Sequence, residues 1–253
     1  QYFLVHPNIE FMNVIISANN LTKIYGEKET SVTALDNINI NFNEMQFTAI
    51  MGPSGSGKST LLHCLAGLDR PSSGQIYLKD SDISTLNDKQ LTKIRRDSFG
   101  FVFQAFNLIP TLTAEENITL PASIAGKKPD MDWVKKVVET VDISDRLTHR
   151  PNELSGGQQQ RVAAARAMAT KPEVIFADEP SGNLDSKSSK ELLVFMKSVV
   201  EELNQTIIMV THDPYAASFA NRVVMLKDGK IASDLEEPTQ EEIISEVTAL
   251  SDI

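Results

Sequence analysis

The sequence predicts an α/β fold with a mainly parallel central sheet, an antiparallel β edge layer and an inserted α-helical lobe. Short, continuous apolar runs recur along the chain and are typical of strands that are buried on both faces. These runs are residues 47–51, 174–177, 207–210 and 223–226. Stretches with helical spacing, such as residues 187–203, separate the later runs. Strands alternating with helices favour a parallel sheet with helices on both faces.

Two regions depart from this pattern. Residues 14–18 are a β-rich run and residues 37–42 alternate polar with apolar side chains, which predicts an antiparallel layer at the edge of the core. Between residues 107 and 153, prolines punctuate helical stretches such as 132–141. We expect no strand there, and therefore a helical lobe over about residues 105–154.

The main domain is expected to cover residues 12–232, with a distinct segment at each end. Residues 1–11 lack the pattern of a signal peptide, and because they precede Met12 we expect a leader foreign to the natural chain. Residues 233–253 contain no Lys or Arg, and their carboxylates form an acidic tail: Asp234, Glu236, Glu237, Glu241, Glu242, Glu246 and Asp252. Capping-box spacing before an apolar stripe predicts a short amphipathic helix, which docks on its own domain or contacts a partner.

Composition excludes several classes of protein. The chain has 253 residues, with 24 Lys and Arg against 34 Asp and Glu, and a formal net charge of −10. This charge argues against general binding to nucleic-acid phosphates. No apolar run reaches the roughly 18 residues of a membrane-spanning helix. One cysteine, Cys64, excludes a disulfide framework and indicates a reducing compartment.

A phosphate-binding loop follows the first buried strand. Residues 52–59 match the pattern G-x-x-x-x-G-K-[ST] between a strand and a helix. The glycines let backbone N–H groups converge on phosphate, Lys58 adds a positive charge, and the Ser59 hydroxyl can ligate Mg²⁺. The candidate nucleotide-binding residues are Gly52, Pro53, Ser54, Gly55, Ser56, Gly57, Lys58, Ser59 and Thr60. This motif narrows the fold to a P-loop NTPase core of the RecA-like type.

Two carboxylates end the apolar run 174–177. Alone, such a pair is more often a strand end that meets solvent, but a phosphate loop upstream favours a catalytic interpretation. We expect Asp178 to hold Mg²⁺ through its water shell and Glu179 to polarise the attacking water.

The letters LSGGQ at residues 154–158 begin a predicted helix. Ser155, Gly156, Gly157 and Gln158 therefore offer a second anion site at a helix N-terminus. If both sites address one nucleotide, either the chain folds them together or two copies face each other head to tail. A two-fold dimer with two ATP molecules at its interface is the economical solution.

Together these motifs resemble the ATP-binding subunit of ABC transporters, over roughly residues 13–232. The resemblance implies that Tyr25 stacks on adenine. It also implies that Gln104 contacts Mg²⁺ and responds to the position of the helical lobe. It also implies that His212 contacts the γ-phosphate and that Asp185 lies in a loop at the dimer interface. Glu179, His212 and Gln104 would then be the catalytic residues.

Within this superfamily, residues 103–121, 176–180 and 211–217 are similar to the macrolide-export, lipoprotein-release and bacitracin-type peptide-resistance branches. The resemblance implies an ATPase that uses ATP and Mg²⁺, pairs with a second copy of itself and drives a membrane permease from the cytoplasmic face of the cell membrane. The alternative is a soluble ABC-type ATPase acting on ribosomes or DNA. The single Walker A motif, the lack of heptads and the acidic charge disfavour it.

Five further side chains belong to none of these motifs, and we assign them to the surface or to packing: His6, His63, His149, Cys64 and Trp133. We expect Arg161 and Arg166 to brace the LSGGQ helix rather than contact nucleotide.

Overall fold

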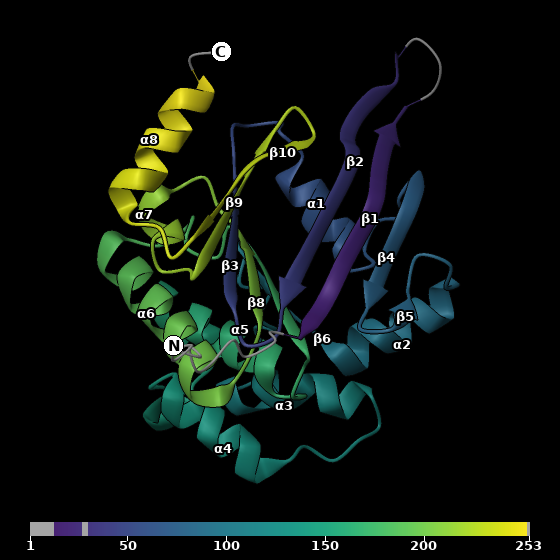
Figure 1. Ribbon diagram of the computed structural model, residues 1–253. Helices are drawn as coiled ribbons and strands as arrows, with labels where there is room; N and C mark the ends of the chain where they lie inside the picture. Colours follow the sequence, from purple (N-terminus) through teal and green to yellow (C-terminus); the bar gives the residue numbers. More distant parts are fainter. Residues whose placement is uncertain (1–12, 27–29, 252–253) are drawn as a thin grey trace, which may run out of the picture.

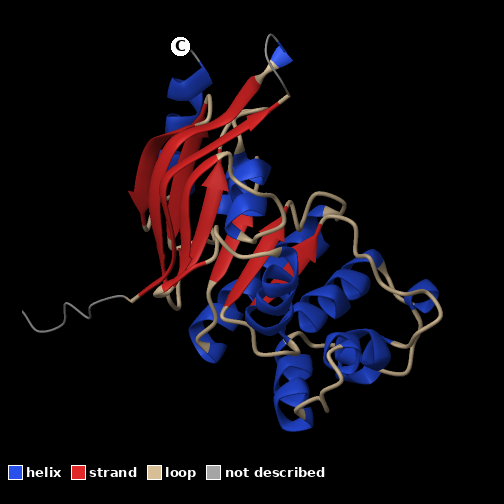
Figure 2. Cartoon of the chain, turned by 90° about the vertical axis from the view of Figure 1, so that its right-hand side faces the viewer, coloured by secondary structure: helices blue, strands red, loops and turns tan. Residues whose placement is uncertain are grey.

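The structure is a computed structural model that describes residues 13–26 and 30–251. The predicted leader, residues 1–11, lies outside this described part. Two β-sheets stack in one half of the molecule, and most of the helices gather in the other half (Figures 1 and 2). Within residues 13–26 and 30–251, no helix combines the length and apolar character that a membrane span requires.

Six strands form the larger sheet, in the order β10–β9–β3–β8–β7–β6. Neighbours from β9 to β6 pair in parallel, whereas β10 is antiparallel to β9. The strands are β3 Phe47–Met51, β6 Phe99–Phe103, β7 Val174–Asp178, β8 Ile207–Val210, β9 Arg222–Lys227 and β10 Lys230–Glu236. Every residue of β3 and β8 is buried, because helices or a second sheet cover both faces.

The antiparallel layer is a separate sheet in the order β2–β1–β4–β5. Its strands are β1 Val14–Tyr25, β2 Val32–Asn43, β4 Ser73–Leu78 and β5 Ser81–Asp82. Strands β1 and β2 extend well beyond the predicted runs 14–18 and 37–42. Their pairing shifts between Ala18 and Leu21, where Asn20 adopts φ +49°. Such a bulge interrupts the alternation from which a strand is recognised.

Helix α1 (Lys58–Leu65) lies between the two sheets. Its buried leucines pack with apolar side chains of both β1 and β8 in one core cluster. Helix α2 (Asp88–Ser98) leads into β6 and begins at a capping box between Asn87 and Gln90. The core on this face therefore fixes the helix that follows the phosphate loop.

Helices gather on the other side of the larger sheet and share a second core cluster. They are α3 Ala114–Ile124, α4 Met131–Thr140, α5 Gly156–Met168, α6 Ser186–Leu203, α7 Pro214–Ala217 and α8 Gln240–Ser251, with single 3₁₀ turns at Ser144–Arg146 and Pro151–Glu153. In this cluster α3 and α4 pack on other helices. Residues 107–153 contain no strand, as predicted. Helix α5 packs on α3 and so joins the lobe to the core.

Helix α8 docks on its own domain. The predicted capping box is present, since Glu242 N donates to Thr239 Oγ1 (3.2 Å) and Thr239 N donates to Glu242 Oε2 (2.7 Å). Ile243 is fully buried, and the rest of the apolar stripe, Val247 and Leu250, packs on the same core. The predicted acidic tail begins inside β10, because residues 233–236 still pair with β9.

Candidate active site

The candidate site lies where four adjacent parallel strands end. The register aligns Ile50 of β3, Val210 of β8, Asp178 of β7 and Phe103 of β6 in one row. The next residues along these strands are therefore neighbours at one edge: Met51, Thr211, Glu179 and Gln104. In open α/β sheets, ligands bind at the carboxyl ends of the strands.

The phosphate loop requires glycine at two positions. Gly52 has φ +148°, and a Cβ there would lie 2.0 Å from the carbonyl oxygen of Leu226. Gly57 has φ +99°, and a Cβ there would lie 2.3 Å from the carbonyl oxygen of Ala34. Gly57 also occupies the N-cap position of α1 and provides no side-chain cap. The first N–H groups of α1 therefore receive no hydrogen bond from an N-cap side chain and can bind an anion.

Lys58 is held inside this loop. Its Nζ donates to the carbonyl oxygens of Gly52 (2.9 Å) and Pro53 (2.8 Å), and the residue is only 9% exposed. Burial lowers the pKa of Lys58, while the carboxylates of Glu179 and Asp178 act in the opposite direction. A cation fixed beside the loop is positioned to balance phosphate charge.

Ser59 and Asp178 form the oxygen pair that was predicted for Mg²⁺. Ser59 Oγ donates to Asp178 Oδ1 at 3.2 Å across 119 residues of sequence. His63 lies on the other side, with Nε2 3.5 Å from Asp178 Oδ2. The interaction with Asp178 raises the pKa of His63, although burial opposes this shift. His63, which the sequence assigned to surface or packing, is partly exposed and contacts a predicted site residue.

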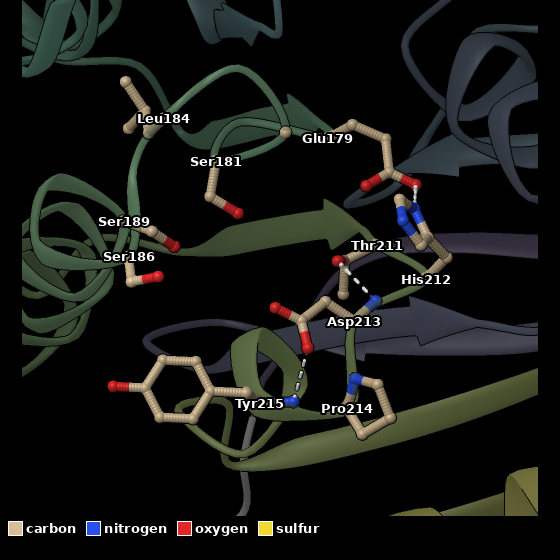
Figure 3. A pocket seen from close by; sticks show the side chains of 11 residues that line it. Glu179, Ser181, Leu184, Ser186, Ser189, Thr211, His212, Asp213, Pro214 and Tyr215 are labelled. Carbon is tan, nitrogen blue, oxygen red and sulfur yellow. Dashed lines mark hydrogen bonds and ion pairs between the residues drawn. The ribbon is translucent and has the colours of Figure 1, made fainter.

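Glu179 and His212 also meet as a pair (Figure 3). His212 Nδ1 lies 2.8 Å from Glu179 Oε1. Glu179 adopts φ +46°, a conformation unusual outside glycine, while its N–H donates to Val210 O (3.0 Å). Next to the pair lies a cavity of about 500 Å³. The turn that bears His212 is fixed by bonds from Asp213 N to Thr211 Oγ1 and from Tyr215 N to Asp213 Oδ1.

Gln104 faces the loop between β7 and α6. Its Nε2 donates to Asn183 Oδ1 (3.1 Å), and Asn183 Nδ2 donates back to the carbonyl oxygen of Gln104 (3.2 Å). A Cβ on Gly182 would lie 2.8 Å from Gln104 Nε2, so the glycine makes room for this side chain. The contact of Gln104 with Mg²⁺ stays a prediction.

Tyr25 lies at the end of β1 and is fixed by groups that the sequence did not indicate. Its hydroxyl donates to Asp69 Oδ2 (2.6 Å), and Lys23 Nζ contacts Asp69 Oδ1 (2.6 Å). Lys23 Nζ also lies 4.7 Å from the centre of the Tyr25 ring. Burial and the bond with Asp69 raise the pKa of Tyr25, and the hydroxyl of Thr60 opposes this. Tyr25 is 42% exposed, so an adenine ring can still stack on it.

The second candidate phosphate site is at the start of α5. Ser155 Oγ accepts from Gln158 N (3.3 Å) and Gln158 Oε1 accepts from Ser155 N (2.9 Å), which is a capping box. The surrounding pocket is lined by Asp142, Asp145, Arg146, Ser155, Gly157, Gln158, Arg161, Ser188 and Glu191. No residue of the phosphate loop lines it, so this pocket does not include the N-terminus of α1.

The expected braces of α5 are present. Arg161 donates to Glu191 Oε2 (2.6 Å) and to the carbonyl oxygen of Val141 (3.3 Å). Arg166 donates to the carbonyl oxygens of Phe106 (2.9 Å) and Asn107 (2.6 Å). These bonds connect the LSGGQ helix to the lobe and to α6.

Asp185 caps α6 rather than pointing to a separate site. Its carboxylate accepts from Lys187 N (3.0 Å), Ser188 N (3.0 Å) and Ser188 Oγ (2.8 Å). A Cβ on Gly157 would lie 2.9 Å from the same Ser188 Oγ. Asp185 therefore orients the contact between α6 and the LSGGQ helix, and its predicted place at the dimer interface, as part of the nucleotide site, stays a prediction.

The donor set fits a magnesium–nucleotide complex. Ser56 Oγ is buried and has no hydrogen-bond partner among the described residues, and the uncapped N-terminus of α1 begins two residues later. Space around Gly55 is open, since a Cβ there would meet nothing within 4 Å. Beside the loop, the oxygens of Ser59 and Asp178 are ligands of the type that Mg²⁺ takes.

These features define a P-loop nucleoside-triphosphate hydrolase. A glycine loop with a buried lysine, an alcohol–carboxylate pair for a cation and a carboxylate that can position water are the parts that P-loop enzymes use for phosphoryl transfer to water. The second helix terminus, in its own pocket, indicates which class of these hydrolases the chain belongs to.

Comparison with known proteins identifies this class. A family model described as ABC transporter matches residues 35–182, more than half of the chain. The chain is 46% identical over 223 residues to MJ0796 of Methanocaldococcus jannaschii, an uncharacterised ABC transporter ATP-binding protein, covering 86% of this chain and 95% of the relative. It is 45% identical to the bacitracin export ATP-binding protein BceA of Halalkalibacterium halodurans, covering 87% and 88% respectively. It is 43% identical to the macrolide export ATP-binding/permease protein MacB of Vibrio parahaemolyticus, covering 88% of this chain and 34% of that protein.

A solved structure agrees. The chain matches the dimeric, post-hydrolysis structure of the cassette MJ0796 bound to ADP and Pi with a TM-score of 0.77 and 42% identity, over 88% of this chain and 99% of that one. The chain therefore belongs to the ABC transporter family, as an ATP-binding subunit and an ATPase. The resemblance drawn from its motifs, including the macrolide-export and bacitracin-type branches, is confirmed.

Proposed function

We propose that two copies of this chain close head to tail on two Mg-ATP molecules and use hydrolysis to drive a membrane permease from the cytoplasmic face. The observation that carries the proposal is the separation of the two phosphate-type helix termini. Because the pocket of Ser155 contains no residue of the phosphate loop, a single chain does not bring both termini to one nucleotide. A second copy related by a two-fold axis supplies the missing terminus to each site, and the dimeric structure of MJ0796 supports this arrangement.

Within each site, the phosphate loop and α1 hold the triphosphate, with Lys58 as its positive charge. Tyr25, which lies beside Thr60, stacks on the adenine. Residues 155–158 and Asp185 of the second copy approach the same nucleotide from across the interface. Ser59, Asp178 and Gln104 hold Mg²⁺. When bound, Mg²⁺ neutralises charge on the β- and γ-phosphate oxygens.

Glu179 is the residue that prepares water for attack. Its backbone N–H donates to Val210 O. This bond fixes the position from which the carboxylate projects beyond the end of β7. His212 Nδ1 at 2.8 Å holds Oε1, which leaves Oε2 to accept a proton from water. The His212 side chain is 74% exposed, so its other ring nitrogen, Nε2, can contact a γ-phosphate while Nδ1 keeps the bond to Glu179.

The permease contact is proposed on the lobe, near residues 106–120. A groove beside it has an apolar lining with three arginines at its edges: Arg95, Arg96, Phe99, Gly100, Phe101, Phe103, Leu120, Pro121, Ile124, Arg166, Ala167 and Thr170. Ile124 is 75% exposed, and Phe101 and Phe103 stack with centres 5.8 Å apart. A permease segment seated there would lie next to Gln104, which follows Phe103 directly.

The alternative is a soluble ATPase that acts on ribosomes or DNA. It would use the same site chemistry, but it would need a surface that attracts nucleic acid. The net charge of −10 opposes an approach to nucleic acid, and we propose no nucleic-acid partner.

The test uses Glu179→Gln as bait in detergent-solubilised membranes of the source cell, with Mg-ATP present. We expect this variant to bind ATP without hydrolysing it and to retain a multi-spanning membrane protein in stoichiometric amount. The control is the double variant Lys58→Ala/Glu179→Gln, which lacks the phosphate-binding charge and should retain less of it. Recovery of ribosomes or DNA-repair proteins with no membrane protein would overturn the transporter proposal and leave the ATPase chemistry.

A further inference from the structure

A histidine that the nucleotide site does not use lies against its cation-binding carboxylate. Ser59 and His63 are four residues apart on α1, so their side chains project from the same face of the helix. Both contact Asp178, which ends β7. Ser59 Oγ donates to Oδ1 (3.2 Å), and His63 Nε2 lies 3.5 Å from Oδ2. One helix thus contacts both oxygens of a single carboxylate.

We infer that His63 is a positioning residue for the cation site: its Nε2–H holds Asp178 Oδ2 and so turns Oδ1 toward Ser59 and the bound Mg²⁺. This inference deepens the proposed function and rests on it. His63 acts through the carboxylate, because Mg²⁺ takes oxygen ligands and avoids imidazole. The side chain of Asp178 is 21% exposed and that of His63 is 38% exposed, so both reach the solvent-facing side of the site.

The physical reason is orientational. The terminal torsion of an aspartate is broad, so a carboxylate held at one oxygen can still rotate about its Cβ–Cγ bond. A second contact, at the other oxygen, restricts this rotation before the cation arrives, and less ordering then remains to be done on binding. Outer-sphere hydrogen bonds to ligating groups typically account for about 10- to 100-fold in metal affinity.

The experiment measures cation binding directly. Purified wild-type chain and variants are titrated with Mn²⁺ in the presence of ADP, and bound Mn²⁺ is followed by electron paramagnetic resonance. His63→Leu removes the donor and keeps an apolar side chain of similar size, and we expect about tenfold weaker Mn²⁺ binding. His63→Gln places an amide N–H at a similar reach and should recover affinity to within about threefold of wild type.

Two further measurements separate positioning from folding. Binding of a fluorescent ATP analogue in EDTA reports the phosphate loop without a cation, and it should be unchanged in both variants. His149→Leu removes an imidazole from the lobe, away from Asp178, and should leave Mn²⁺ binding unchanged. If His63→Leu does not fold, His63→Asn, which keeps an amide but is too short to reach Oδ2, takes its place.

The inference is overturned if His63→Leu binds Mn²⁺ as tightly as wild type. It is also overturned if binding in EDTA weakens in parallel, or if Gln recovers no more affinity than Leu. Failure of the wild-type chain to bind Mn²⁺–ADP at all would instead count against the proposed nucleotide site. The two failures are therefore distinguishable.

Discussion

The N-termini of α1 and α5 carry the two phosphate-binding motifs, but they are built in opposite ways. At α1 the N-cap residue, Gly57, has φ +99° and makes no side-chain bond, and the next residue is a buried lysine. At α5 the N-cap residue, Ser155, makes a complete capping box with Gln158. The first terminus has no side-chain cap of its own, whereas the second is capped in the free chain.

Under the proposed function, this difference gives the two termini different moments in the cycle. The α1 terminus is already arranged for an anion, because the glycine conformations and the buried Lys58 are fixed by folding. At α5, a phosphate must share the terminus with Ser155 or displace it, so binding there gains less. We therefore infer that the free chain binds nucleotide through α1, and that α5 engages only when a second copy presents its nucleotide.

The largest expected effect comes from Glu179→Gln. Because a positioned general base contributes about 10²- to 10⁴-fold, steady-state ATP hydrolysis should fall by that factor. Binding of a fluorescent ATP analogue should stay within about twofold of wild type, since the α1 terminus is unchanged. Glu202→Gln, on the exposed side of α6, is the control and should hydrolyse ATP normally. Hydrolysis by Glu179→Gln at the wild-type rate would remove this residue from the mechanism.

The next effect separates the two termini in the monomer. Lys58→Ala removes a charge-assisted contact with phosphate worth about 1.5–3 kcal/mol, so Kd for ATP should rise roughly 10- to 150-fold. The matched change near the other terminus is Arg146→Ala, because Arg146 lines the pocket of Ser155. At protein concentrations where the chain is monomeric, isothermal titration should show unchanged affinity for it. Equal weakening by both variants would contradict the assignment of nucleotide binding to α1.

The same contrast explains how much of the site could be predicted from sequence. Turns, helix starts and strand ends are local, so the glycine loop, the helix start at Ser155 and the carboxylates after β7 were all recognisable. The interactions of His63 with Asp178, of Asp69 with Tyr25 and of Asn183 with Gln104 were not. Each of these interactions joins residues from different elements. No periodicity or motif in the sequence predicts which residues of two elements will meet.

The fold shows the same division. Continuous apolar runs identified β3, β7, β8 and β9, because strands buried on both faces have an unmistakable composition. Strands β4, β5 and β10 and helices α2 and α7 were not predicted. Strand β10 alternates exposed and half-buried residues and carries several charges, so its stability comes from pairing with β9 rather than from its own composition.

The smallest effect tests the α5 terminus itself. Ser155→Ala removes the cap that accepts from Gln158 N, so the free energy of unfolding should fall by about 1 kcal/mol, measured by urea denaturation. Monomer affinity for ATP should not change, because α1 is intact. In the Glu179→Gln background, analytical ultracentrifugation with Mg-ATP should show weaker dimerisation, since each nucleotide loses a hydroxyl from the opposite copy.

The matched control for this change is Thr113→Ala. Thr113 caps α3 with the same kind of capping box, formed with Glu116, so its loss should cost a similar free energy of unfolding. It lies in the lobe, away from Ser155, and should leave ATP-dependent dimerisation unchanged. If both variants weaken the dimer equally, the effect of Ser155→Ala is one of helix stability, and the α5 terminus has no separate part in holding nucleotide. A selective loss in Ser155→Ala would show that a terminus already capped in the free chain still contributes to the site across the interface.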